Sequence, residues 1–288
     1  MPTEKQDAFL GQLAAQIGPE RLGPYLANSR GDALKALARY HWNIRLCQVY
    51  YPLLHALEVG LRNGLDRALV KQVSIRGFGQ IQSWLDLSPT ILRHPHAKED
   101  LEKAKSKLLR KDPASGQFVA NPRVGHSDLV AALSFGFWTG LLEDIYQHPV
   151  DAGGVAFWPV CEAQVFPGAS GVPLSAIRAR YTKVRQLRNR VFHHEPIWPK
   201  RPSDATPKEV YDQVVEGLRW LGGAQSQIPH RYFGDAKTLD EAHALPVAEE
   251  DLLRAIDGAL EAAAKKAAKK AAVQAAREAL KNVQKMPG

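Results

Sequence analysis

The sequence predicts an all-α protein, and three observations support this class. Apolar residues recur every three or four positions in most segments, which is the period of an α-helix rather than of a strand. No two alternating apolar runs are joined by a turn of the Asn-Gly type, so we expect no sheet. Hydrophobic residues make up 45% and charged residues 24% of the 288 residues, which is typical of a chain that folds around a core.

The first third of the chain contains three predicted helices. A short helix is expected from about Lys5 to Ile17, after which Gly18-Pro19 and Gly23-Pro24 interrupt the pattern. Asp32 can cap the second helix, and Pro52 suits the first turn of the third, where the N–H that proline lacks is not needed. The leucines of the third helix are three or four residues apart and define one buried face: Leu54, Leu57, Leu61, Leu65 and Leu69.

The middle of the chain alternates between loops and helices. Glycine and proline mark residues 74–97 and 112–125 as loops, and a charged, exposed helix is expected between them, from Lys98 to Lys111. Ser127 can cap an apolar helix over residues 129–146. This helix is apolar on nearly all sides, so we expect it to be central.

Two further helices are predicted before the C-terminal segment. The first runs from about Leu174 to Phe192 and ends before Glu195-Pro196, because the residue before a proline resists the α conformation. Its apolar residues share one face: Ile177, Tyr181, Val184, Leu187 and Val191. The second begins at Thr206-Pro207-Lys208-Glu209, which has the pattern of a capping box, and ends at Gly222-Gly223.

The C-terminal segment is rich in alanine and lysine, which favour helix. We therefore divide the chain into a helical domain, residues 1–246, and a basic helix or tail, residues 247–288. Large apolar residues are sparse beyond Leu260, so residues 261–288 are expected to project from the domain. Residues 259–288 carry a net charge of +5, which leaves +3 for the rest. The tail is either a solvated helix or a nucleic-acid arm that binds through its lysines: Lys265, Lys266, Lys269 and Lys270.

Several classes of protein are excluded or disfavoured by what the sequence lacks. Cys47 and Cys161 form neither a disulfide framework nor a Cys-x-x-Cys pair, and no phosphate-binding loop or His-Glu-x-x-His motif occurs. His94-Pro95-His96 has no thiol or carboxylate partner nearby, so we expect no metal and no cofactor. The N-terminus has no apolar leader, and the longest uncharged stretch, residues 129–142, is too short to span a bilayer. We expect a cytoplasmic protein with no membrane partner.

The segment from Arg188 to His194 contains the residues best suited to chemistry on RNA. A histidine with a pKa near neutrality can move the protons when a 2′-hydroxyl attacks the adjacent phosphorus, and a guanidinium can stabilise the phosphoryl oxygens. Asn189 could hold the imidazole tautomer or a phosphate oxygen. Arg188 and His193 are five residues apart and point about 140° away from each other on an ideal helix. The spacing therefore favours a site that two chains share in a homodimer.

The alternative is that these residues have no catalytic role. Arg188 and Arg190 would then be surface charges at a helix C-terminus, where cations are favoured, and His193-His194 would cap the helix.

Four stretches together carry a resemblance to a known family. They are 40–43 (Tyr-His-Trp-Asn), 57–63 (Leu-Glu-Val-Gly-Leu-Arg-Asn), 126–138 (from His-Ser-Asp-Leu-Val to Phe-Gly-Phe-Trp) and 187–197 (Leu-Arg-Asn-Arg-Val-Phe-His-His-Glu-Pro-Ile). In these stretches the chain resembles Abi-like proteins of the AbiD/AbiF type, within the HEPN superfamily. Arg188-Asn189 and His193 resemble the Arg-x4-6-His motif of that superfamily.

The resemblance implies a HEPN-like helical bundle with extra helices, and a homodimer. It also implies a metal-independent endoribonuclease that acts as an abortive-infection toxin in phage defence and is opposed by a protein or RNA antitoxin. Arg188 and His193 would be the catalytic pair, Asn189 their polar companion and His194 a secondary candidate. The main alternative is a non-catalytic RNA-binding or regulatory HEPN module, and a DNA-binding scaffold that uses the tail is a third.

Other residues are candidates for a supporting role. Glu58 and Arg62 are four residues apart on one helix, so they could form a surface ion pair. Alternatively, the segment from Glu58 to Asn63 packs beside the motif helix and orients Arg188 or His193. Two arginines near the motif, Arg185 and Arg190, are candidates to contact RNA phosphates.

Overall fold

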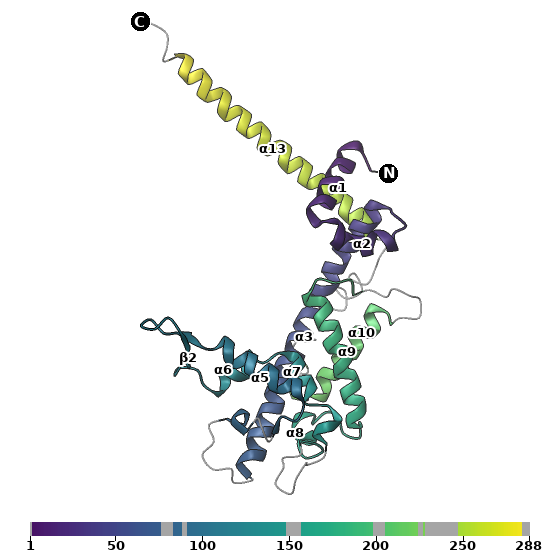
Figure 1. Ribbon diagram of the computed structural model, residues 1–288. Helices are drawn as coiled ribbons and strands as arrows, with labels where there is room; N and C mark the ends of the chain where they lie inside the picture. The colour runs from purple at the N-terminus through teal and green to yellow at the C-terminus, as the bar shows by residue number, and fades with distance from the viewer. Residues whose placement is uncertain are drawn as a thin grey trace. The chain divides into compact units, whose positions relative to one another are not determined.

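The computed structural model describes residues 2–75, 83–87, 91–147, 157–197, 205–223, 227 and 247–283, and these residues confirm the all-α class (Figure 1). The elements in chain order are α1 (Glu4–Ile17), α2 (Pro19–Asn28), α3 (Ala33–Ile75), η1 (Trp84–Leu87), α5 (Pro95–Lys107), β1 (Arg110–Lys111), β2 (Phe118–Val119), α6 (His126–Ala132), α7 (Phe135–Gly140), η2 (Asp144–Tyr146), α8 (Glu162–Val165), α9 (Leu174–Phe192), α10 (Pro207–Trp220) and α13 (Val247–Val283). No described helix is both long enough and apolar enough to cross a membrane.

Contacts divide the chain into two compact units, Met1–Arg45 with Asp240–Gly288, and Leu46–Leu239. This division differs from the boundary that we expected at residues 246/247. The reason is that the first turns of α13 have apolar residues, Leu252 and Ile256, which are buried in the first unit. Polar contacts also join α13 to this unit, since the amide of Gln6 donates to Asp257 at 2.8 Å.

Beyond Leu260, the described side chains of α13 are exposed, as the sequence predicts. Every side chain from residue 261 to residue 275 is exposed, including those of the four lysines. Figure 1 shows that α13 begins beside α1 and α2 and then continues beyond them.

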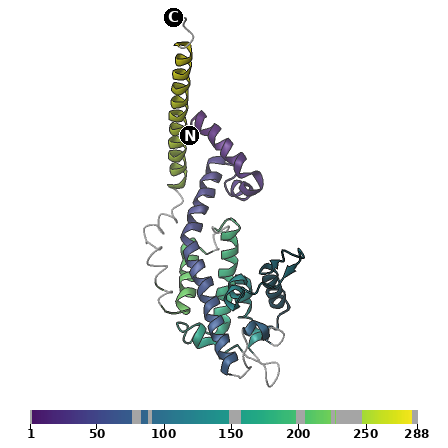
Figure 2. The same cartoon turned by 90° about the vertical axis from the view of Figure 1, so that its left-hand side faces the viewer.

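The second unit is built around the part of α3 from residue 46 onward, which runs beside α9 and α10. Figures 1 and 2 both show α3 and α9 side by side. The predicted leucine face of α3 and the predicted apolar face of α9 are both buried, so these two predictions are confirmed. The hydroxyl of Tyr181 on α9 donates to the carbonyl of Gly217 on α10 at 3.0 Å. Gly217 also gives Leu57 of α3 room to approach, which brings the three helices together.

Pro52 does not begin a helix, and this prediction was wrong. It lies inside α3, which continues for 43 residues from the predicted cap at Asp32. The helix lacks one backbone donor at Pro52, but Gln48, whose carbonyl would accept it, is an exposed residue that water can reach. A similar error concerns Gly23-Pro24, which lies within α2 rather than in a loop.

The helix predicted over residues 129–146 is broken in the structure. α6 ends at Ala132, Leu133 adopts an extended conformation, and α7 begins after Ser134. The hydroxyl of Ser134 accepts from the backbone N–H of Phe137, so a new N-cap competes with continued helix at this point. The N-cap of α6 is Gly125 rather than Ser127.

A short hairpin occupies part of the loop expected over residues 112–125. Strands β1 and β2, of two residues each, pair antiparallel, so the expectation of no sheet was wrong here. The turn does not use Asn-Gly. Instead the carboxylate of Asp112 accepts from the backbone N–H groups of Ala114 and Ser115, and Gly116 has a φ of +69°.

The helix before the hairpin, α5, starts at Pro95 and ends at Lys107, earlier at both ends than predicted.

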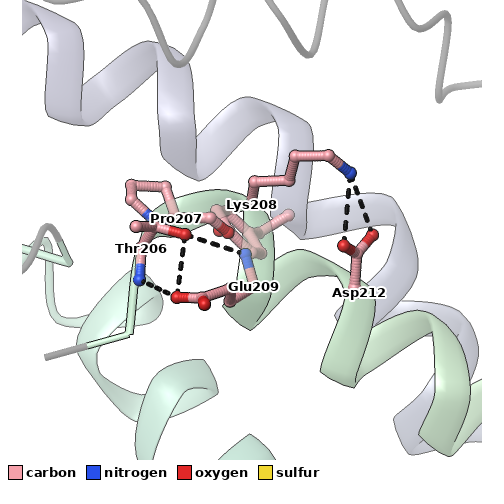
Figure 3. A network of polar contacts seen from close by, with 6 residues as sticks. Thr206, Pro207, Lys208, Glu209 and Asp212 are labelled. Atoms are coloured by element: carbon pink, nitrogen blue, oxygen red, sulfur yellow. Dashed lines mark hydrogen bonds and ion pairs between the residues drawn. The ribbon is translucent and has the colours of Figure 1, made fainter.

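The capping box of α10 is present as the sequence predicts (Figure 3). The backbone N–H of Thr206 donates to Glu209 at 2.7 Å, and the backbone N–H of Glu209 donates to the Thr206 hydroxyl at 3.2 Å. The backbone N–H of Thr206 and then its hydroxyl, which also donates to the Glu209 carboxylate at 3.0 Å, lower the pKa of that carboxyl. These bonds fix the start of the helix that packs against α9, and α9 contains the candidate catalytic motif.

Candidate functional site

The motif begins at Arg188 near the end of α9 and continues past Phe192, where the helix ends, to His194. Leu187 and Val191 are buried, so the core fixes the rotation of this helix. As a result, Asn189 is exposed and the side chain of Arg188 is 26% exposed at the edge of the core.

Arg188 is held by an ion pair with Glu58 of α3. Its Nε donates to Oε2 of Glu58 at 3.0 Å, and its Nη2 donates to Oε1 at 3.5 Å. The Glu58 side chain is only 22% exposed, so the pair is partly shielded from solvent. A guanidinium bound by both carboxylate oxygens has a fixed plane and direction. Glu58 therefore positions Arg188.

This contact bears on the two interpretations of the Glu58 segment. It favours packing beside the motif helix over a surface pair with Arg62. The Nε of Arg62 instead donates to the side chain of its neighbour Asn63 at 3.2 Å.

Three aromatic rings extend from Arg188 along α3 and α9. The guanidinium of Arg188 lies 4.2 Å from the centroid of the Phe192 ring, as in a cation–π contact. Phe192 stacks on Tyr51 with centroids 5.4 Å apart, and Tyr51 stacks on His55 at 6.4 Å. We call His55, Tyr51 and Phe192 the aromatic row. The sequence analysis missed it, although Tyr51, His55 and Glu58 are spaced four and three residues apart, as on one face of a helix.

The end of α9 places both histidines in an exposed turn. His193 is the C-cap, and His194 has a φ of +57° in the left-handed region, where glycine is usual. The N–H of Glu195 donates to the carbonyl of Arg190 at 2.8 Å, and the N–H of His194 donates to that of Val191 at 3.2 Å. This is a Schellman motif with histidine in place of glycine. A strained non-glycine residue at a helix end is a feature found at functional sites.

The remaining predicted RNA contacts lie in different surroundings. Burial raises the pKa of the Cys47 thiol on α3 to about 11, and the charge of Arg190 partly opposes this effect. Arg185 is half-buried. The four lysines of α13 are exposed and belong to the other compact unit.

A second polar cluster, also missed from the sequence, joins α3, η1 and α6. Asp66 Oδ1 accepts from Trp84 Nε1 at 2.7 Å and lies 2.8 Å from His126 Nε2. Because the carboxylate only accepts, the Nε2 of His126 carries a proton, and its Nδ1 lies 2.6 Å from the Ser83 hydroxyl. Ser83 is buried and its oxygen also accepts from Leu85 N, so we assign this cluster a structural role.

A pocket of about 430 Å³ adjoins this cluster, and Ser83 and His126 are among its lining residues. Within the residues that the structure describes, no three His, Cys, Asp or Glu side chains are placed to hold a metal ion together.

Comparison with known proteins does not identify the chain. No protein-family model matches it, and no curated protein or solved structure gives a match. The resemblance to Abi-like proteins therefore rests on the four stretches of sequence alone.

Proposed function

We propose that this chain is a metal-independent endoribonuclease of the HEPN type that acts as an abortive-infection effector. The observation that supports this best is the pairing of Arg188 with Glu58, which fixes a guanidinium five residues before His193 at an exposed helix end. Phosphate chemistry requires a cation in a defined direction, which this pair provides.

The proposed reaction needs only groups that the chain contains. His193 takes the proton from the 2′-hydroxyl, whose oxygen forms a bond to the adjacent phosphorus. The bond from phosphorus to the 5′-oxygen breaks, and that oxygen receives a proton from the second acid, which is His193 of the other chain or His194. The products are a 2′,3′-cyclic phosphate and a 5′-hydroxyl end.

Arg188 can bind the phosphate while it remains paired. A guanidinium has five N–H donors, and the contacts with Glu58 use two of them. Three donors are left for the phosphoryl oxygens, whose negative charge grows as the pentacovalent state forms. Asn189 is exposed one residue further on and can bind an oxygen or an imidazole.

The proposal includes a homodimer. On α9, Arg188 is directed towards α3, and His193 lies at the helix end five residues later. Two copies related by an axis near Asn189 would place two guanidiniums and two imidazole pairs around one phosphate. The further parts of the proposal are an RNA substrate in the cytoplasm, a protein or RNA antitoxin, and a tail that adds non-specific affinity for RNA.

Cleavage of a labelled RNA by single variants tests the proposal. His193→Ala and Arg188→Ala should each lower the rate on the order of 100-fold or more, and EDTA should leave the rate unchanged. The matched controls are His96→Ala, which removes an exposed histidine, and Arg178→Ala, which removes an α9 arginine that is also paired with an acid, Asp144. Both controls should cleave at the wild-type rate.

Three results would contradict or redirect the proposal. Full activity of His193→Ala would refute the site, and loss of activity in EDTA would indicate a metal. RNA binding without cyclic phosphate products would favour the non-catalytic module. Mixing Arg188→Ala with His193→Ala tests the shared site, because heterodimers of the two should regain activity if each site combines residues of both chains.

A further inference from the structure

The aromatic row is unusual because its rings are stacked and exposed at the same time. Tyr51 is 49% exposed and Phe192 is 37% exposed. Their planes differ by 28°, and those of Tyr51 and His55 by 26°. Centroid separations of 5.4 and 6.4 Å indicate offset rings, so part of each face remains open. Stacked rings of this kind are usually buried, as Trp158 and Phe166 are here.

The chemistry around the row limits what could cover it. Arg188 lies against Phe192 on one side, and the exposed turn with His193 follows Phe192 directly. A purely apolar partner would have to cover this guanidinium and these imidazoles at a desolvation cost. A nucleobase has an aromatic face and is covalently joined to an anionic phosphate, so it suits both parts of this surface.

We propose that Tyr51 and Phe192 form a stacking platform for an unpaired nucleobase next to the phosphate that Arg188 binds. This inference rests on the proposed ribonuclease function. It adds a specificity-determining element: bases inside a duplex are stacked on their neighbours and cannot reach the platform, so cleavage requires a single-stranded or looped segment. The position of the stacked base relative to the phosphate selects the bond that is cleaved. The platform does not select the identity of that base, because every base has a π-face that can stack.

The experiment uses a single-stranded oligonucleotide of ten nucleotides with one 2-aminopurine and 2′-O-methyl groups throughout, which removes the attacking hydroxyl. The fluorescence of 2-aminopurine falls when it stacks on an aromatic ring, and anisotropy reports total binding. Wild-type protein should quench the probe. Tyr51→Ala should abolish quenching and weaken binding about 5- to 150-fold, whereas Tyr51→Phe should retain both.

The matched control is Phe118→Ala, which removes a ring that is 71% exposed on β2, away from the motif. It should quench and bind as wild type does. A duplex of the same sequence should bind wild type and Tyr51→Ala equally, because its bases are not available for stacking.

The outcomes separate the platform from the proposed function. Unchanged quenching in Tyr51→Ala would overturn the platform, and so would a dimer that dissociates in Tyr51→Ala, because the rings would then be contacts between copies. Quenching that depends on Tyr51, without cleavage of the unmodified RNA, would support the platform and contradict the nuclease. Absence of RNA binding by the wild-type protein would overturn both.

Discussion

Replacement of Glu58 by glutamine tests whether the ion pair positions Arg188. Two unit charges 4 Å apart attract by about 4 kcal/mol at an effective dielectric constant of 20, and desolvation offsets most of this. Exposed pairs contribute about 0 to 1 kcal/mol, and loss of one partner of a buried pair costs about 3 to 5 kcal/mol. The side chains here are 26% and 22% exposed, so Glu58→Gln should lower the free energy of unfolding by about 1 to 2 kcal/mol.

The assay is a double-mutant cycle measured by urea unfolding, with Glu58→Gln, Arg188→Gln and the double variant. The coupling energy should be about 1 kcal/mol and should decrease in high salt. Cleavage by Glu58→Gln should fall about 10- to 100-fold, mainly in kcat, because the guanidinium loses its fixed direction. The control is Glu216→Gln on α10. It breaks the ion pair with Arg180, which lies on α9 as Arg188 does, and it should leave cleavage unchanged.

Two results would refute this reasoning. A coupling energy near zero would show that the pair contributes nothing to positioning. Faster cleavage by Glu58→Gln would show that Glu58 restrains Arg188 by neutralising its charge, which is the opposite of the role that we assign to it.

Three further predictions concern the helix end, the core and the tail. Replacing His194 by glycine removes a left-handed strain and should stabilise the fold by about 0.5 kcal/mol in urea unfolding; a loss of cleavage as large as that of His193→Ala would make His194 the catalytic residue. Burial raises the pKa of the Cys161 thiol to about 11, so the unfolded chain loses this proton first and the free energy of unfolding should fall as pH rises from 9 to 11. Burial also raises the pKa of the Cys47 thiol to about 11, so Cys161→Ala should still lose some stability. Wild type should lose about 1 kcal/mol more than Cys161→Ala between about pH 9 and pH 10, and equal slopes in the two proteins would contradict this prediction. Deleting residues 261–288 should leave the unfolding temperature unchanged. The slope of the logarithm of the RNA-binding constant against the logarithm of salt concentration should become less steep by up to about 3, for the four lysines of α13. An unchanged slope would show that the tail is not an RNA arm.

Features of α9 and α10 that depend on neighbouring residues could be predicted from the sequence. The box at Thr206 and Glu209 and the apolar face of α9 depend on contacts within a few residues, and both were found as predicted. The break at Ser134 was missed because the sequence allows either a new cap or a continued helix, and packing decides between them. Pro52 was misplaced because helix propensity alone does not show that packing on both sides can hold a helix together across a proline.

The candidate site was predictable only as a list of residue types. The spacing of Arg188 and His193 is visible in the sequence. For Glu58 the sequence left two interpretations open, a surface ion pair with Arg62 or a role in orienting the motif. Its contact with Arg188 joins residues that are 130 positions apart, so it depends on the packing of α3 against α9. The stacking of Tyr51 on Phe192 depends on the same packing.

The exposed part of α13 has a consequence for how the tail would meet a polyanion. The helix has 37 residues, about 55 Å at 1.5 Å per residue, and among the side chains that the structure describes the buried apolar ones, Leu252 and Ile256, lie in its first turns. Those turns act as a preformed nucleus, so the costly initiation step of the helix–coil transition is already complete. Helix content beyond Leu260 should then decline gradually towards the C-terminus, and backbone amides there should exchange progressively faster with solvent. The spacing between successive lysines is therefore adjustable, so the same segment can follow phosphate chains of different curvature.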